Sequence, residues 1–318
     1  IGLLFANIFN NAGLFPTLAL EEGAVWDKAT SANFMDTLVA IFPSNMWKSF
    51  TEANMLQVIV FALFLGVALL SLGEKAKVFT SFIDQGSDVM LKIVEYIMAV
   101  SPIGIASLMA TMVSTISGAT MKEVVSFIIM DYGCGITILL IVYPLLIKLL
   151  ARVPVISFMK KISEPMIVAV TTTSSAATLP ISIKVAGEKL GVPENIYGFT
   201  LPLGNTCGMN GFAMFIGLCC IFASNLYGMP VTVASLAQFI FLGIILSVGA
   251  AGVKGAGIVM STVLLEAIGM PLTLIPILAA IWPAIDPIHT LMNNTSDLVG
   301  TMLIARQLDK VDMNVYNS

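Results

Sequence analysis

The sequence predicts an all-α integral membrane protein, and three observations support this fold class. Of the 318 residues, 58% are hydrophobic and only 11% are charged, whereas soluble domains carry about 25% charged residues. Apolar runs of about 20 residues match membrane-spanning helices better than the shorter strands of a barrel. Polar interruptions also divide several apolar segments into short arms, and this pattern recurs in two successive units. We expect membrane lipid, and no nucleic acid, around this protein.

Basic side chains indicate the orientation in the membrane. They gather in the middle of the chain and near its end, at Lys148, Arg152, Lys160, Lys161, Lys184, Lys189, Arg306 and Lys310. Because cytoplasmic loops carry an excess of Lys and Arg, we expect this group and the C-terminus in the cytoplasm. The acidic Glu21, Glu22 and Asp27 then belong to an external loop. The sequence therefore predicts a multi-pass protein of the plasma (cell inner) membrane.

The first half of the chain supplies apolar segments with few polar groups. The chain opens on IGLLFANIF without a signal-peptide pattern, so we interpret residues 1–9 as part of a cut helix and expect a fragment lacking its N-terminus. We assign 1–72 to a partial scaffold region and 73–151 to connecting transmembrane helices. Asp131 and Glu95 are acids within spans, which suggests function by default. Both lie near segment ends, so we expect water or headgroups to reach them.

The stretch VTTTSSAATLP at 170–180 separates two apolar arms, 154–170 and 179–190. Backbone that leaves a helix at membrane depth must be covered by protein or line a wet cavity. The hydroxyls of residues 171–175 offer donors and acceptors to a ligand, although a small-residue packing patch is the alternative. Each arm is too short to cross a core of about 30 Å. We therefore predict a re-entrant helical hairpin with both ends in the cytoplasm.

The pattern of a hairpin followed by a helix occurs twice. The apolar segment 197–227 is broken by GNTCGMNG at 204–211, whose glycines disfavour continuous helix and would expose carbonyl oxygens. A second pair of short arms, 231–249 and 258–268, surrounds GAAGVKGAG at 249–257. Paired interrupted segments in two units are typical of an inverted-repeat secondary transporter with broken transmembrane helices and its site between the repeats.

The last apolar helix carries a polar face. Asp286, His289, Asn293 and Asp297 are spaced 3, 4 and 4 residues apart, so they share one side of the helix, with Thr290 beside them. Each charge at mid-membrane costs about 2.5–3.5 kcal/mol on insertion scales. This face must therefore meet a wet cavity, a cation or a ligand. His289 is the only histidine in the chain, and its polar neighbours favour a functional role over a structural one.

Taken together, four motifs make the chain resemble the dicarboxylate/amino-acid:cation symporter family, the glutamate-transporter family. They are TTTSSAATLP (171–180), LPLGNTCGMNG (201–211), GAAGVKGAG (249–257) and DPIHTLMNNTSD (286–297). The resemblance implies a homotrimer in which a transport core moves like an elevator against a trimerisation scaffold. We place this core at 152–308 and a cytoplasmic tail at 309–318. The family's first two helices, and most of its third, have no counterpart in the sequence.

The resemblance also implies roles for individual residues. The implied substrate contacts are Ser174, Ser175, Val253, Gly257, Asp286, His289, Thr290 and Asn293. Among them, Asp286 would receive the substrate amino group. The implied cation ligands are the backbone carbonyls of Gly204, Gly208 and Asn293 and the carboxylate of Asp297. Sodium ions would be the coupling ions, with protons as the alternative, and no other cofactor is expected.

Departures from the family pattern bear on the substrate and the cation. Gly208, Asn210 and Phe212 stand where the family has an Asn, an Asp and a hydroxyl residue, which puts one cation site in doubt. His289 replaces the Arg of members that carry acidic substrates, and His is neither fixed in charge nor forked. Lys254 replaces a Pro at the second hairpin tip. We therefore expect an amino acid other than glutamate or aspartate, and a pH-dependent contact at His289.

The sequence thus predicts a cation-coupled amino-acid symporter, with sodium favoured over protons, and not an enzyme. A proton-coupled dicarboxylate or amino-acid symporter is the first alternative. A substrate sensor that does not transport, or a channel, is the second. Ser174 or Ser175 with His289 could be drawn as a hydrolase dyad, but no G-x-S-x-G motif is present.

Overall fold

The computed structural model describes residues 1–11, 39, 41–52, 54–115, 118–226, 228–250, 256–270 and 272–317. Within these ranges all regular structure is helical and there is no strand, which confirms the all-α prediction. Four helical stretches are apolar and long enough to cross a membrane: Leu56–Met90, Val124–Ala151, Glu194–Leu226 and Ile275–Gln307. Helices fit this environment because they satisfy their backbone hydrogen bonds internally.

The N-terminal helix packs against one of the buried helices of the bundle. Helix α1 (Gly2–Asn11) lies along α12 (Asn210–Leu226). Gly2 permits this close approach, because a Cβ atom there would lie 2.6 Å from the carbonyl oxygen of Met214. The predicted external loop with Glu21, Glu22 and Asp27 lies outside the described residues.

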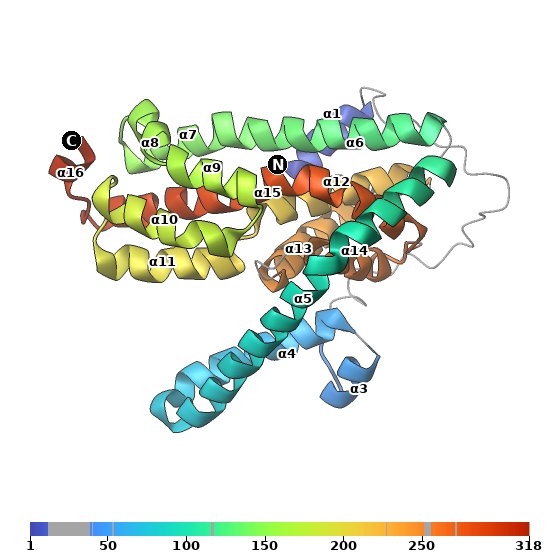
Figure 1. Ribbon diagram of the computed structural model, residues 1–318, viewed down its shortest axis with the longest axis horizontal. Helices are drawn as coiled ribbons and strands as arrows, with labels where there is room; N and C mark the ends of the chain where they lie inside the picture. The colour runs from blue at the N-terminus through green and yellow to red at the C-terminus, as the bar shows by residue number, and fades with distance from the viewer. Residues whose placement is uncertain are drawn as a thin grey trace.

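Helices α3 (Met46–Thr51), α4 (Met55–Leu72) and α5 (Lys77–Thr115) follow. Asn45 and Asn54 cap α3 and α4 through their side-chain oxygens, as short polar side chains do at helix starts. A short 3₁₀ helix, η1 (Gly73–Ala76), joins α4 to α5. Figure 1 shows α3, α4 and the first half of α5 projecting away from the remaining helices, whereas the later part of α5 packs on α15.

The span Val124–Ala151 begins in α6 (Gly118–Thr137). It continues through the π-helical turn η2 (Ile138–Val142), α7 (Tyr143–Leu146) and the π-helical turn η3 (Ile147–Ala151). The turn η2 ends two residues before Pro144. Proline has no backbone N–H to donate, and a π-helical turn is one way in which a helix accommodates it. The helix stops at Arg152, which adopts a left-handed conformation with φ 54°.

A helical hairpin follows. Helix α8 (Val155–Lys161) leads into α9 (Ser163–Thr172), which packs against α10 (Ser175–Glu188). The tip is narrower than the polar stretch 170–180 suggested, because only Thr173, at φ 47°, and Ser174 lie outside the helices. The Ser174 side chain accepts a hydrogen bond from the Ala177 N–H at 3.2 Å and so starts α10.

The predicted broken helix is also present, with a shorter break. Helix α11 (Glu194–Cys207) and α12 are separated only by Gly208 and Met209. The second pair of arms forms α13 (Val233–Gly249), which starts at a capping box on Thr232, and α14 (Ala256–Ala267). The tip between them, 251–255, lies outside the described residues, and so do Val253 and Lys254.

Helix α15 (Ile275–Gln307) is the centre of the bundle and follows the 3₁₀ helix η4 (Leu272–Leu274). It contacts α5, α6, α9, α10, α11, α12 and α14, and it runs between their layers in Figure 1. The short helix α16 (Met313–Asn317) folds back, and the Tyr316 hydroxyl donates to the Pro154 carbonyl at 3.1 Å. Any polar group on the inner faces of α15 therefore meets protein from several elements.

Candidate functional site

The polar face of α15 is enclosed by the bundle. His289, Thr290 and Asn293 are buried, whereas Asp286 and Asp297 are half-buried. Thr290 Oγ1 lies 3.5 Å from an oxygen of Asp286, four residues earlier, which is at the limit of a hydrogen bond. The predicted polar stripe thus faces protein, and its members divide into two groups with different surroundings.

Asp297 lies against the break between α11 and α12. A Cβ atom added at Gly208 would lie 2.6 Å from Asp297 Oδ1, and one at Gly204 would clash with the same carboxylate. Only glycine lets this carboxylate approach the backbone of the break so closely. Within the described residues, no hydrogen-bond donor and no cationic side chain contacts the Asp297 carboxylate. The carboxylate therefore lies beside backbone, and no described residue gives it a positive partner.

Asn293 ties α15 to the same break. Its side-chain oxygen accepts a hydrogen bond from the Gly211 N–H at 2.7 Å, and its amide nitrogen lies 3.2 Å from the Met209 sulfur. The Asn293 carbonyl accepts from the Ser296 hydroxyl at 2.7 Å. Asn210 in turn donates to that hydroxyl at 2.6 Å. The predicted cation ligands Gly204, Gly208, Asn293 and Asp297 are thus brought together by one helix break.

His289 lies in a different environment, because an acid from another helix contacts it. Its Nε2 is 3.0 Å from both carboxylate oxygens of Asp131 on α6. The side chains of His289 and Asp131 are 3% and 0% exposed. The prediction that water or headgroups reach Asp131 is therefore wrong: the burial of Asp131 is offset by a hydrogen bond to His289.

The His289 ring also packs within an aromatic cluster. Its centroid lies 5.6 Å from the rings of Phe215 and Trp282. Phe212 stacks on Phe215 at 5.8 Å and lies 6.1 Å from Trp282. Phe212 is thus a packed core residue. His289 Nδ1 is buried without a hydrogen-bond partner in the described part of the chain, so among the described residues the ring is hydrogen-bonded only through Nε2, to Asp131.

The first hairpin tip reaches α15 through Ser175. Asn294 Nδ2 donates to Ser175 Oγ at 3.1 Å and to the Thr290 carbonyl at 2.9 Å. Ser175 is buried, whereas Ser174 is half-buried and uses its own oxygen to cap α10. The tip of the predicted hairpin therefore lies beside the polar face of α15, as the sequence suggested.

The second hairpin reaches the same region through Gly257. A Cβ atom at Gly257 would overlap the Trp282 ring, so the start of α14 lies directly on α15 beside the aromatic cluster. Val253 lies outside the described residues. Seven of the eight predicted substrate contacts therefore have described positions: Ser174, Ser175, Gly257, Asp286, His289, Thr290 and Asn293.

Two residues of this region were not among the predicted site residues. The first is Asp131, which the sequence analysis expects to be solvated. It lies seven residues into the span Val124–Ala151, which corresponds to about 10 Å along a helix at 1.5 Å per residue. This depth in the membrane, together with the presence of a single histidine in the chain, was the sequence evidence that Asp131 could pair with His289. Asn294 gave no signal of its own, because its contact with Ser175 joins segments far apart in the sequence.

The chemistry of the region suits a hard monovalent cation better than a transition metal. Among the described residues, no group of three or more His, Cys, Asp or Glu side chains could hold a metal ion. What the helix break offers instead is one carboxylate, Asp297, beside backbone and side-chain amide groups. Oxygen ligands of this kind suit hard cations, and unwound helices in transporters use them for sodium.

Comparisons with known proteins identify a family and several relatives. Residues 1–307 match the sodium:dicarboxylate symporter family. The chain is 29% identical to mouse "Excitatory amino acid transporter 3", covering 82% of this chain and 51% of that protein. It is 32% identical to rat "Neutral amino acid transporter B(0)", covering 82% and 48%. It is 25% identical to the "Proton/sodium-glutamate symport protein" of Geobacillus stearothermophilus, covering 96% and 74%.

The chain spans about half the length of the first two of these relatives. Its match to the family nevertheless runs from the first residue through the end of α15 and includes both hairpin segments, the broken helix and the polar face. A match of this extent, on a helical chain with four stretches able to cross a membrane, settles its membership. The chain belongs to the sodium:dicarboxylate symporter family, a family of membrane transporters.

Proposed function

We propose that the protein is a sodium-coupled amino-acid symporter. The observation that supports this most is the Asp297 carboxylate, which lies against Gly204 and Gly208 with no positive partner among the described residues. A carboxylate within a membrane protein is costly unless something balances its charge. A sodium ion held by Asp297 and the carbonyls of Gly204, Gly208 and Asn293 would do so. Such an ion would be carried with the substrate.

The substrate site lies one to three helical turns away on the same face of α15. In our proposal Asp286 binds the substrate ammonium, and Thr290, Asn293 and the first hairpin tip bind the remaining polar groups. The second hairpin contributes Gly257 and, from its tip, Val253. This arrangement places the substrate and the cation on either side of Asn293, whose side chain fixes Gly211. Binding of one would then help to order the groups that bind the other.

The pairing of His289 favours a neutral substrate side chain. Members of the family that carry acidic substrates have an Arg at this position, which provides a fixed positive charge. Here the only ring nitrogen of His289 with a hydrogen-bond partner in the described chain faces Asp131, so any charge on the imidazole is balanced within the protein. We therefore infer that glutamate and aspartate bind weakly and that neutral amino acids bind better. The rat relative is a neutral amino acid transporter by name.

One specific observation favours proton coupling as a second candidate. Asp131 and His289 form a buried pair of a carboxyl and an imidazole, with His289 Nε2 3.0 Å from the Asp131 carboxylate. The Geobacillus stearothermophilus relative is described as a proton/sodium-glutamate symport protein. Under this alternative, a proton on the pair replaces or accompanies sodium at Asp297.

In the complete protein we place residues 152–308 in a transport core that moves as an elevator against a scaffold, with residues 1–72 in that scaffold and 73–151 between them. The hairpins would be re-entrant, and three chains would form a trimer in the cell membrane. The C-terminal tail, 309–318, would be cytoplasmic, since the basic residues flank this end of the bundle.

Uptake by the full-length protein in proteoliposomes tests the proposal. A sodium gradient at equal pH on both sides should drive accumulation of a labelled neutral amino acid, with alanine, serine, glutamate and aspartate compared. Accumulation driven only by a pH gradient would support the proton alternative. If substrate binds but exchanges across the membrane under neither gradient, the protein is a sensor and the proposal is wrong.

A further inference from the structure

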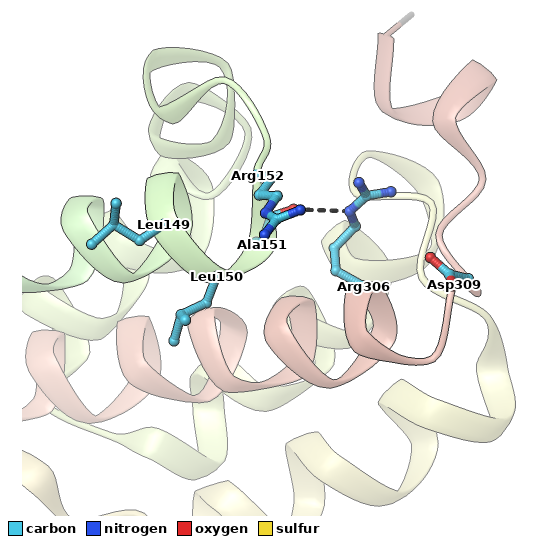
Figure 2. A pocket seen from close by; sticks show the side chains of 6 residues that line it. All are labelled: Leu149, Leu150, Ala151, Arg152, Arg306 and Asp309. Atoms are coloured by element: carbon cyan, nitrogen blue, oxygen red, sulfur yellow. Dashed lines mark hydrogen bonds between the residues drawn. The ribbon is translucent and has the colours of Figure 1, made fainter.

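A second polar site lies at the basic end of the bundle, away from the substrate region. It is a cavity of about 220 Å³ between the end of the span Val124–Ala151 and the end of α15. Figure 2 shows the residues that line it, which are Leu149, Leu150, Ala151, Arg152, Arg306 and Asp309. Neither the transport proposal nor the family resemblance gives this cavity a role.

The arginine of α15 is oriented by the backbone. Arg306 Nε donates to the Ala151 carbonyl at 2.9 Å (Figure 2). One terminal nitrogen lies 3.6 Å from the Met313 sulfur, which is a weak acceptor. The guanidinium is therefore held at the cavity with donors left for a stronger acceptor. Such a planar fork matches the oxygens of a phosphate or carboxylate.

The second arginine is brought to the same cavity by a turn of the backbone. Arg152 ends η3 in a left-handed conformation, φ 54°, and its side chain is exposed. Within the described residues it makes no ion pair. Asp309 also lines the cavity, but it lies beyond salt-bridge distance of both guanidinium groups. Two positive groups and one negative group thus share a small space without pairing.

Two lysines at this end of the molecule have partners. Lys189 pairs with Glu164 at 2.9 Å, and Lys161 lies over the Tyr316 ring at 5.6 Å. The cavity itself is lined by two arginines and one aspartate, a net charge of +1. Two guanidinium groups that line one cavity repel each other unless an anion lies between them.

Apolar side chains at the same cavity indicate which anion. Leu149 and Leu150 are 58% and 51% exposed, and they are among the last residues of a stretch apolar enough to cross a membrane. Exposed leucines beside one exposed and one half-buried arginine mark the boundary between acyl chains and headgroups. A soluble anion would use the arginines and leave the leucines in water, whereas a phospholipid would cover both.

We propose that this cavity binds the phosphate of one anionic phospholipid, with Arg152 and Arg306 contacting the headgroup and Leu149 and Leu150 contacting its acyl chains. Basic pockets between membrane helices on the cytoplasmic side are suited to such headgroups. At this site the end of the span Val124–Ala151 is joined to the end of α15 by the hydrogen bond from Arg306 to the Ala151 carbonyl. A bound lipid would therefore strengthen this junction without contacting the substrate.

Native mass spectrometry of the full-length protein, titrated with phosphatidylglycerol or phosphatidylcholine, tests the proposal. We expect one saturable phosphatidylglycerol per chain and weaker binding of phosphatidylcholine. Arg152→Gln should weaken phosphatidylglycerol binding about fivefold, as loss of one basic contact predicts. Asp309→Asn should strengthen it, because it removes the negative group. Lys160→Gln is the matched control, since Lys160 is exposed on α8 at the same end and does not line the cavity.

The outcomes separate the possible ligands. If Arg152→Gln and Lys160→Gln have equal effects, general surface charge explains the binding and the proposal is wrong. If millimolar inorganic phosphate displaces phosphatidylglycerol, the site binds free anions and the lipid assignment is wrong. Thermal midpoints measured in phosphatidylcholine nanodiscs show whether each variant is folded. Arg306→Lys, which keeps the charge and loses the fork, should fall between wild type and Arg152→Gln.

Discussion

His289 and Asp297 lie eight residues apart on one helix, but their side chains have different surroundings. His289 is buried and meets the carboxylate of Asp131 at 3.0 Å. Asp297 is half-buried and lies against the backbone of Gly204 and Gly208 at the break between α11 and α12. The protein supplies a partner of complementary charge for the first residue and, among its described residues, none for the second.

This difference separates structural polar groups from those that await a ligand. Both residues are costly within a membrane, and both look alike in a sequence pattern. His289 with Asp131 is a completed pair, so its removal should affect stability first. Asp297 is an incomplete site, so its removal should affect cation binding first. The following predictions test this division in order of expected effect.

The largest effect is expected from Asp131→Ala. Removing one partner of a buried pair leaves His289 without its hydrogen bond, and such changes cost about 3–5 kcal/mol. Asp131→Asn should cost less, because its amide oxygen can still accept the Nε2 proton. Unfolding in mild detergent with increasing denaturant gives the free energies. Asp84→Ala, an exposed acid on α5, should change stability by less than about 0.5 kcal/mol. A similar result for Asp131→Ala would show that the pair is not structural.

Asp297→Asn comes next and should act on function. We expect uptake driven by sodium to fall about 100-fold, which corresponds to about 2.7 kcal/mol, because a neutral amide cannot balance the charge of the cation. Global stability should stay near that of wild type, since no described side chain donates to this carboxylate. Flux is measured in proteoliposomes, with Asp84→Asn, at an exposed acid on α5, as a control. Unchanged sodium-driven flux would remove Asp297 from the cation site.

Gly204→Ala should lower sodium affinity about tenfold, or about 1.4 kcal/mol. Within a helix, Gly→Ala is normally stabilising by about 1 kcal/mol. At Gly204 the new methyl would clash with the Asp297 carboxylate, whereas at Gly198 on the same helix it would meet open space. Gly198→Ala should therefore stabilise the protein and leave sodium affinity unchanged. Equal sodium titrations for the two variants would contradict the proposed position of Asp297.

A smaller effect is expected at the hairpin tip. Ser175→Ala removes the hydrogen bond from Asn294 and should lower stability by about 1 kcal/mol. Because the tip then loses its tie to α15, substrate affinity should also fall. Ser126→Ala is the control, since the hydroxyl of that half-buried serine donates to the Lys122 carbonyl of its own helix. Thermal midpoints with and without substrate measure both effects. An unchanged substrate-induced shift in Ser175→Ala would place the tip outside the substrate site.

The smallest effect concerns the exposed pair Glu164 and Lys189. The Lys189 ammonium, 2.9 Å away, lowers the pKa of the Glu164 carboxyl. A lowered pKa in the folded state adds stability above the ordinary carboxyl pKa of about 4.3, and this stability is lost as pH falls through the lowered value. The Tm difference between wild type and Glu164→Gln should therefore be small at neutral pH and vanish in acid. Glu188→Gln, on the same hairpin, should show no such trend.

The sequence predicts those parts of the fold and site that depend on residues close together in the chain, and not those that depend on contacts between distant segments. The four motifs and the 3, 4, 4 spacing on α15 depend on local pattern, and the helical bundle and the break at Gly208 were predicted from them. The breadth of the breaks was overestimated, because Ser174 caps α10 and Asn293 holds Gly211. The partnership of Asp131 with His289 spans 158 residues, so only packing could assign it.

The measurement that tests the central claim most directly is sodium binding followed by calorimetry on the full-length wild type and two variants. We predict that Asp131→Asn binds sodium with near wild-type affinity, provided that it is folded, and that Asp297→Asn shows no sodium heat. This result would confirm that the protein balances His289 itself and leaves Asp297 to a cation. Sodium binding that survives in Asp297→Asn and disappears in Asp131→Asn would contradict the account.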